Sequence, residues 1–205
     1  MLRRFLPVVI LLLLCACDSI YDEREAEPLT DGHHFRNIDA SRYTHWVYVN
    51  LQKGDTTSVS VSNDLPPEDW DIALHRYDIK TRSGAGMATP YLSLDELKQA
   101  VDEGTFVRPA ADDWVRDVED SIVVDMSHMM DGYLVYAPSH RNPALSHWVN
   151  VDMRSMPPLY TMSEQVYLVL LADSSCMAIR FTGFTNPNAY GAKGYVSFDV
   201  EGVSW

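Results

Sequence analysis

Two short stretches of this 205-residue chain carry methionine where core packing does not call for it. Met129 and Met130 precede an Asp-Gly pair, and Met153 and Met156 lie just before a Pro-Pro pair. Asp-Gly favours a tight turn and consecutive prolines fix an extended backbone, so both groups are expected in loops. Methionine usually fills irregular gaps in a core. In loops, the thioether is instead a candidate soft ligand of the kind that haem iron accepts axially.

Histidine offers a second type of ligand, but only one of the two loops contains it. His128 adjoins Met129, whereas the segment between Asp152 and Tyr160 has no histidine. The other histidines that could bind a metal are His33, His34, His140 and His147. The chain has no HExxH motif and no closely spaced cysteine pair in its C-terminal part, so a zinc centre is not expected.

Signatures of catalysis and of nucleic-acid binding are missing from the sequence. It has no GxSxG motif, phosphate-binding loop or dinucleotide fingerprint, and the glycines at 84 and 86 are expected to end a strand. An enzyme is therefore not expected. With 16 Lys and Arg against 29 Asp and Glu, the net charge is −13. That charge argues against binding nucleic acid or docking electrostatically to an anionic membrane.

In the segments that must position these loops, apolar residues recur at every second position. The stretch 70–81 is the first example. Its apolar residues alternate between two faces, with Trp70, Ile72 and Leu74 on one and Ala73, Tyr77 and Ile79 on the other. This pattern predicts one strand, ended by Ser83–Gly86. Its polar and charged residues include Asp71, His75, Arg76 and Asp78. If they are buried, they need partners.

Most of the remaining periodic segments also predict strands, and only one predicts a helix. The expected strands are 38–51, 57–61, 122–124, 133–136, 148–151, 166–171, 178–184 and 194–200. Segments 112–120 and 138–146 are expected to be acidic and polar loops. Ser93 and Glu96 form a capping-box pattern, followed by helical spacing that Gly104 can end. The fold class predicted is all-β, with mostly antiparallel sheets and one short helix.

The first 17 residues have the features of a bacterial targeting segment. Arg3 and Arg4 precede an apolar run over 5–14 that is too short for a membrane-spanning helix. Residues 14–17 resemble a lipobox, which places the lipid on Cys17 and predicts a lipoprotein signal peptide over 1–17. A plain secretory signal cleaved nearby is the alternative.

The segment 18–35 is polar and acidic, and cannot bury enough apolar surface to fold alone. It is interpreted as a flexible tether ahead of a β domain over 36–205. The acidic run resembles a surface-export signal of some bacteria, and a solvated spacer is the alternative. Once Cys15 is removed and Cys17 is lipidated, only Cys176 remains, so no disulfide is expected. Cys176 is interpreted as a small apolar filler.

Several blocks along the chain resemble the HmuY family of haem-binding lipoproteins. They occur in the order and approximate spacing of that family, at 38–48, 70–78, 160–167, 178–182 and 193–195. The resemblance implies an HmuY-like β domain that captures haem, iron protoporphyrin IX, outside the cytoplasm. It also implies lipid anchorage in the outer membrane, facing the cell surface, and transfer of haem to a TonB-dependent outer-membrane receptor.

The resemblance leaves the axial ligands open. The best-known family pattern uses two histidines and other members use methionine. Alignment on Tyr160 puts Met153 in the ligand position, whereas alignment on the Ser-Met-Pro-Pro motif favours Met156. We expect Met129 with Met156, and keep Met130, Met153 and His128 as substitutes. Nearby aromatic and basic residues could line the ligand or pair with its propionates, namely Tyr133, Tyr136, Trp148, Tyr160, Arg154 and Lys193.

Two other functions stay open at this point. A β-rich surface lipoprotein with an adhesive or structural role would need no cofactor, and a metal-dependent enzyme would need a metal. Another tetrapyrrole could also replace haem.

Overall fold

The computed structural model describes residues 29–30, 32–63, 65–155, 157–188 and 190–204. Within these residues the chain forms antiparallel sheets and one helix longer than two turns, which confirms the predicted fold class. The larger sheet has seven strands in the order β1 (Leu29–Thr30), β2 (His34–Asp39), β15 (Lys193–Val203), β14 (Cys176–Thr185), β13 (Val166–Leu170), β7 (Ala85–Ala88) and β8 (Val115–Arg116). The predicted start of the domain at residue 36 falls within β2. The predicted signal peptide and Cys17 lie outside the described residues.

A four-stranded sheet packs against one face of the larger sheet. Its order is β4 (Thr56–Ser60), β3 (His45–Val49), β5 (Ile72–His75) and β6 (Asp78–Thr81). The main core fills the space between the two sheets, with Ile72 and Leu74 on one side and Phe181 and Phe198 on the other. In the central strands alternating residues face this core, such as Val47 and Val49 in β3 and Tyr167 and Val169 in β13.

The other face of each sheet is covered by a smaller cluster. Helix α1 (Leu94–Asp102) lies over the larger sheet, where Leu97 contacts Val166 and Leu168. The helix begins as predicted, because the Ser93 side chain accepts a hydrogen bond from the Glu96 amide. A short 3₁₀ turn, η2 (Ala111–Asp113), follows. Among the described residues, no helix combines the length and apolarity needed to cross a membrane.

The stretch 70–81 is not one strand, so that prediction is wrong. It forms a hairpin in which β5 pairs with β6 and Leu74 lies opposite Ile79. Arg76 reverses the chain with a φ of 55°, a conformation uncommon for residues other than glycine. The reversal brings Ile72, Leu74 and Ile79 to the same core, which a continuous strand could not do.

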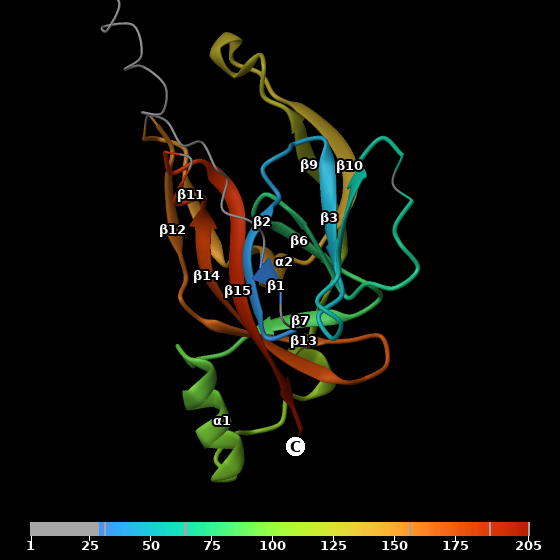
Figure 1. Cartoon of the computed structure of the whole chain (residues 1–205), viewed down its shortest axis with the longest axis vertical. Helices are drawn as coiled ribbons and strands as arrows, with labels where there is room; N and C mark the ends of the chain where they lie inside the picture. The colour runs from blue at the N-terminus through green and yellow to red at the C-terminus, as the bar shows by residue number, and fades with distance from the viewer. Residues whose placement is uncertain (1–28, 31, 64, 156, 189, 205) are drawn as a thin grey trace, which may run out of the picture.

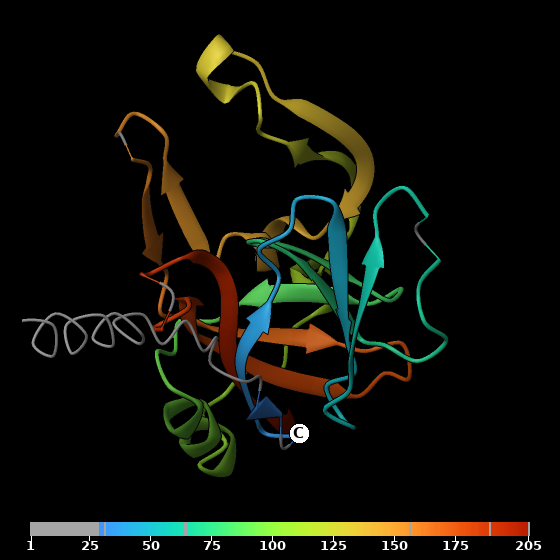
Figure 2. The same cartoon turned by 45° about the horizontal axis from the view of Figure 1, so that its top comes forward.

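Two hairpins project from the main body and are here called the first and second arms. The first arm joins β9 (Val118–Asp125) to β10 (Val135–Arg141), with the 3₁₀ turn η3 (Met129–Asp131) at its tip. The second arm joins β11 (Val149–Asp152) to β12 (Leu159–Met162). Both arms extend from the end of the molecule opposite α1 (Figures 1 and 2). The predicted loops over 112–120 and 138–146 are therefore partly wrong, because β9 begins at Val118 and β10 continues to Arg141.

The segment 142–148, here called the connector, joins the two arms and contains the short helix α2 (Pro143–Ser146). Asn142 caps α2, since its side chain accepts a hydrogen bond from the Leu145 amide at 3.0 Å. The Leu145 side chain packs on β7 where Gly86 leaves room for it. A Cβ atom built on Gly86 would lie only 2.4 Å from Leu145 Cγ. Gly86 is therefore required for α2 to sit this close to the sheet.

We expect Gly86→Ala to lower the free energy of unfolding by about 1–3 kcal/mol, because the added methyl group must displace Leu145. Gly202→Ala is the matched control in β15, where the added atom would meet only Met177 Sδ at 4.0 Å. Urea unfolding of the chain from Asp18 onward measures both. Equal stability of Gly86→Ala and the native chain would contradict this account of α2.

Candidate functional site

Exposed apolar side chains concentrate on the two arms. Among the described residues, seven of the twelve large apolar side chains that are exposed lie there, namely Val118, Met130, Tyr133, Val135, Tyr136, Met153 and Leu159. Single exposed apolar residues are ordinary, but a concentration on two neighbouring projections indicates a binding surface. The exposure of these apolar side chains is by itself enough to identify the arms as the candidate site.

The tip of the first arm presents one imidazole and two thioethers. Met129 is half-buried in η3, and Met130 is 82% exposed. His128 stacks on the Tyr133 ring at 4.7 Å between centroids, and its Nδ1 lies 3.2 Å from an Asp131 carboxylate oxygen. Gly132 ends the turn with a φ of 89°, as the Asp-Gly pair predicted. The turn holds these side chains within six consecutive positions of the tip, 128–133.

The tip of the second arm carries the other predicted ligands. Met153 is 53% exposed, whereas Met156 lies outside the described residues. Arg154 is almost fully exposed and its guanidinium lies 3.1 Å from the Asp152 carboxylate. The tips of the two arms therefore both carry thioether donors at the same end of the molecule (Figure 2).

The four aromatic residues expected near the loops separate into two groups. Tyr133 and Tyr136 are exposed on the first arm. Trp148 is 1% exposed and stacks on Phe181 at 4.2 Å, so it is a core residue. Tyr160 is half-buried at the base of the second arm, where the Lys193 ammonium lies 5.8 Å from the centre of its ring.

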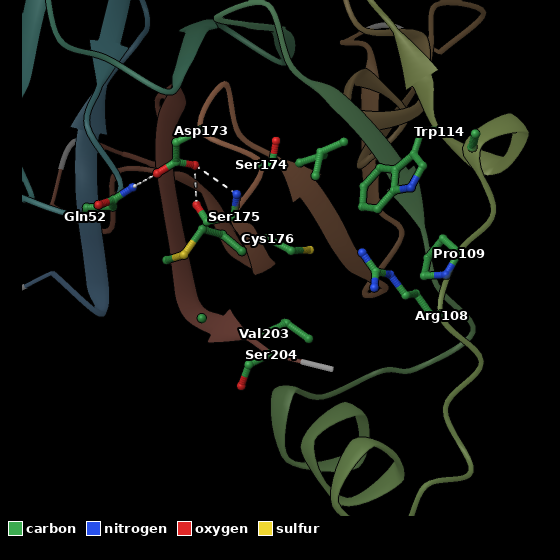
Figure 3. A pocket seen from close by; sticks show the side chains of 14 residues that line it. Gln52, Arg108, Pro109, Trp114, Asp173, Ser174, Ser175, Cys176, Val203 and Ser204 are labelled. Atoms are coloured by element: carbon green, nitrogen blue, oxygen red, sulfur yellow. Dashed lines mark hydrogen bonds between the residues drawn. The ribbon is translucent and has the colours of Figure 1, made fainter.

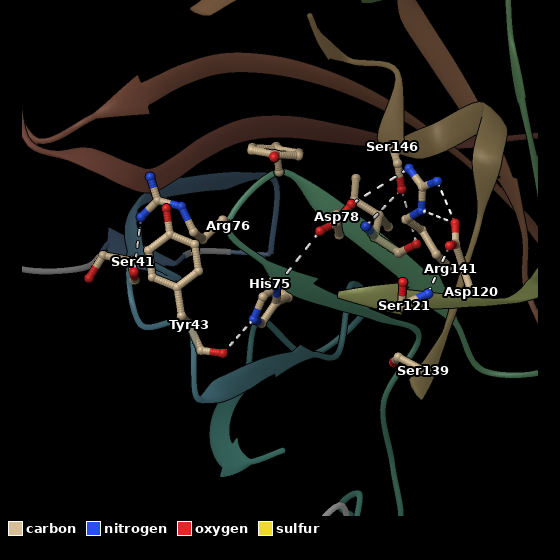
Figure 4. Close-up of polar contacts among 12 residues, drawn as sticks. Ser41, Tyr43, His75, Arg76, Asp78, Asp120, Ser121, Ser139, Arg141 and Ser146 are labelled. Atoms are coloured by element: carbon tan, nitrogen blue, oxygen red, sulfur yellow. Dashed lines mark hydrogen bonds and ion pairs between the residues drawn. The ribbon is translucent and has the colours of Figure 1, made fainter. Parts of the chain in front are cut away.

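A chain of charged groups holds the base of the first arm on β6. Arg141 donates to Asp120 across the arm, at 2.9 Å from Nε, and its Nη1 lies 3.6 Å from Asp78 (Figure 4). The hydrogen bond from Arg141 lowers the pKa of Asp120. Asp78 lies in turn 3.7 Å from the imidazole of His75, which is buried. The position of the arm is thus coupled to the β5–β6 hairpin.

Comparison with known proteins assigns this architecture to a family. The profile of the family described as HmuY protein matches residues 42–200, most of the chain. The chain belongs to the HmuY family. Among curated proteins, none matches it.

Solved structures of HmuY relatives share the fold. A Bacteroides fragilis protein named as a lipoprotein is 41% identical, with a TM-score of 0.73 over 84% of this chain and 92% of that one. A Bacteroides vulgatus protein named as HmuY-like and heme-binding is 38% identical, with a TM-score of 0.73 over 86% of this chain and 97% of that one. A Tannerella forsythia protein named as an HmuY analog is 26% identical, with a TM-score of 0.66 over 89% and 100%.

Sequence reasoning missed several residues that shape the site in this HmuY family member. Val135 and Leu159 are exposed on the arms although their apolar character suggested burial. Arg141 and Asn142 were assigned to a loop, yet both hold the arm in place. The segment 135–141 carried little signal, because its apolar residues precede its polar ones instead of alternating with them, and the proline at 138 argues against a central strand.

A separate cavity of about 860 Å³ lies away from the arms, beside the last residues of β15 (Figure 3). Trp114, Arg108 and Asp173 are among its lining residues, and so is Cys176. Cys176 is buried, and this burial raises the pKa of its thiol to about 12. A protonated thiol is a poor nucleophile, which agrees with a packing role for Cys176.

We expect Cys176 to react slowly with a disulfide reagent at pH 8 in the native protein, because its pKa near 12 leaves almost no thiolate. In denaturant the thiol should react at the rate of an ordinary cysteine, whose pKa is about 8.5. The chain from Asp18 onward has only this cysteine, so absorbance of the released thiol reports it alone. Equal rates in the native and denatured states would disprove the assignment.

Proposed function

We propose that this protein is a haem-binding lipoprotein that holds haem between its two arms. The observation that carries the proposal is the concentration of exposed apolar and thioether side chains on the arms. Haem is a flat apolar molecule with iron at its centre, so two apolar surfaces with soft donors suit it. Membership of the HmuY family, and a relative named as heme-binding, support the same ligand.

The donor set of the arms fits haem iron. We assign the axial positions to Met129 and Met156, with Met130, Met153 and His128 as substitutes. Met130 and Met153 are already exposed, and Met129 is held in the η3 turn. Bound haem would supply an iron atom whose potential methionine ligands raise. The chain itself would cover the porphyrin faces with Tyr133 and Tyr136 and exclude water from the iron.

Anchorage and transfer complete the proposal. Acylation at Cys17 would tether the domain to the outer membrane through the part of the acidic segment 18–35 that precedes β1, and more than one acyl chain makes such an anchor stable. The Bacteroides fragilis relative named as a lipoprotein supports this anchorage. Haem held at the arm tips, the outermost part of the fold, is suitably placed for release to a TonB-dependent receptor on the cell surface.

Haem titration of the chain from Asp18 onward tests the function and the ligands together. We expect saturation at one haem, read from the Soret band in the ferric and ferrous states. Met129→Ala and Met156→Ala should each weaken binding by about tenfold or more, since loss of one axial bond of about 1.4 kcal/mol or more corresponds to that factor.

Met126→Ala is the matched control, because Met126 lies in the same loop but is not an assigned ligand. If haem saturates the protein and neither Met129→Ala nor Met156→Ala weakens binding, the proposed function stands. The axial ligands are then Met130, Met153 or His128. Failure to bind haem would overturn the function and leave the adhesive or structural role.

The ligand pair also predicts the response to acid. A methionine has no proton to gain near pH 6, whereas a histidine ligand does. We expect the ferrous spectrum to persist from pH 7 to pH 5 and His128→Ala to leave it unchanged. Loss of the ferrous spectrum across this range in the native chain, but not in His128→Ala, would identify His128 as a ligand.

A further inference from the structure

A second cavity, of about 450 Å³, lies beside the end of β6 and is not part of either arm tip. Three separate chain segments line it: residues 80–84, the β8 end at 116–117, and β10 at His140. Trp70 completes the lining. The cavity lies at the end of the four-stranded sheet opposite the Arg76 turn, because Ile72 pairs with Thr81 at that end.

Cationic side chains converge on this cavity in a chain that is strongly acidic. Its lining includes Lys80, Arg82 and Arg116, with the imidazole of His140 beside them, against the single carboxylate of Asp117. The whole chain has almost twice as many acidic as basic residues, 29 against 16. A local excess of basic groups therefore departs from the rest of the surface, and such a concave basic site attracts anions.

The nearby carboxylates are already engaged. Asp117 accepts hydrogen bonds from the Thr81 amide at 2.7 Å and hydroxyl at 3.0 Å, and from the Asn142 side chain at 3.0 Å. The Arg82 guanidinium lies 3.7 Å from Asp69, which also binds Lys53.

The two remaining basic groups differ in their surroundings. His140 lies across the β9–β10 ladder from Glu119. Arg116 is exposed, and its guanidinium contacts no carboxylate within the described part of the chain. Arg116 thus has its donors available for an incoming oxyanion, which a guanidinium can bind through two parallel hydrogen bonds.

The lining also offers a flat apolar surface. Trp70 is 9% exposed and packs edge-to-face on Tyr48, with ring centroids 4.9 Å apart. Lys80 lies over the Trp46 ring at 4.4 Å, so its stem and charge are held against this aromatic group. At Gly84 an added Cβ would lie 2.3 Å from the Leu170 carbonyl oxygen, so the turn beside Arg82 is held close to β13. The side of the cavity formed by Trp70, Lys80 and Gly84 is consequently fixed by packing, while Arg82 and Arg116 are exposed at its edge.

We propose that this cavity binds a small organic oxyanion, a carboxylate or phosphate carried on a body of about the size of a monosaccharide. Arg116 and Arg82 bind the anionic group, and Trp70 contacts the body of the ligand. Cavities of this volume fall in the range that takes organic ligands, and an inorganic ion would fill only part of it. The site does not depend on haem binding by the arms.

Calorimetric titration of the protein at low salt with glucuronate, glucose 6-phosphate and glucose tests the proposal. We expect one or both anionic sugars to bind and the neutral sugar not to bind. Arg116→Gln should weaken anion binding by about tenfold, since a charge-assisted hydrogen bond is lost. Arg42→Gln is the matched control, an exposed arginine at the other end of the four-stranded sheet, and should bind as the native protein does.

The pattern across the sugars identifies the anion. Binding of glucuronate alone indicates a carboxylate site, binding of glucose 6-phosphate alone indicates a phosphate site, and each result supports the proposal. Three results overturn it: no binding of either anion at millimolar concentration, equal binding of glucose, or equal affinities of Arg116→Gln and the native protein. Thermal unfolding of Arg116→Gln confirms that the variant is folded.

Discussion

The arrangement of the two arms depends on hydrogen bonds between the connector and the β5–β6 hairpin. The Asn142 amide donates to the Ile79 carbonyl at 2.7 Å, and the Ile79 amide donates to the Ser146 hydroxyl at 3.0 Å. The Trp148 indole donates to the Tyr77 carbonyl at 2.9 Å. These groups are largely buried, so losing a partner would cost about 1–3 kcal/mol each. Because the connector lies between the arms in the chain, these bonds fix the point where the first arm ends and the second begins.

The same hairpin buries the side chains of Arg76 and His75, and the fold supplies a hydrogen-bond partner for each side chain. Arg76 is 8% exposed; its guanidinium donates to the Ser41 carbonyl at 3.0 Å and lies 4.5 Å from the centre of the Tyr43 ring. His75 is 1% exposed, and its Nε2 donates to the Tyr43 carbonyl at 2.8 Å. Without such contacts, burial of these groups would be strongly unfavourable. The polar residues in this stretch therefore join the β2–β3 link to the hairpin that holds the arms (Figure 4).

The fold class could be read from the sequence because most strands alternate, and the helix because Ser93 and Glu96 cap it. The failures have local causes. At Arg76 the chain reverses without the glycine, asparagine or proline that ordinarily signals a turn. At Pro138 a proline lies within β10, which has β9 on one side only, so its missing amide interrupts no central ladder. In both places tertiary contacts override the local pattern.

The candidate site was only partly predictable for the same reason. The methionine-bearing turns are local features, whereas the contacts that orient the arms join residues about 70 positions apart, such as Trp148 and Tyr77. An isolated two-stranded hairpin is only marginally stable in water. Ile122 and Trp148 bury the arm bases in core clusters, while the exposed apolar residues beyond them have no such support. The bases are therefore preorganised, which reduces the entropic cost of ordering the arms when a ligand binds. The tips keep apolar surface that stays exposed to solvent until a bound ligand covers it.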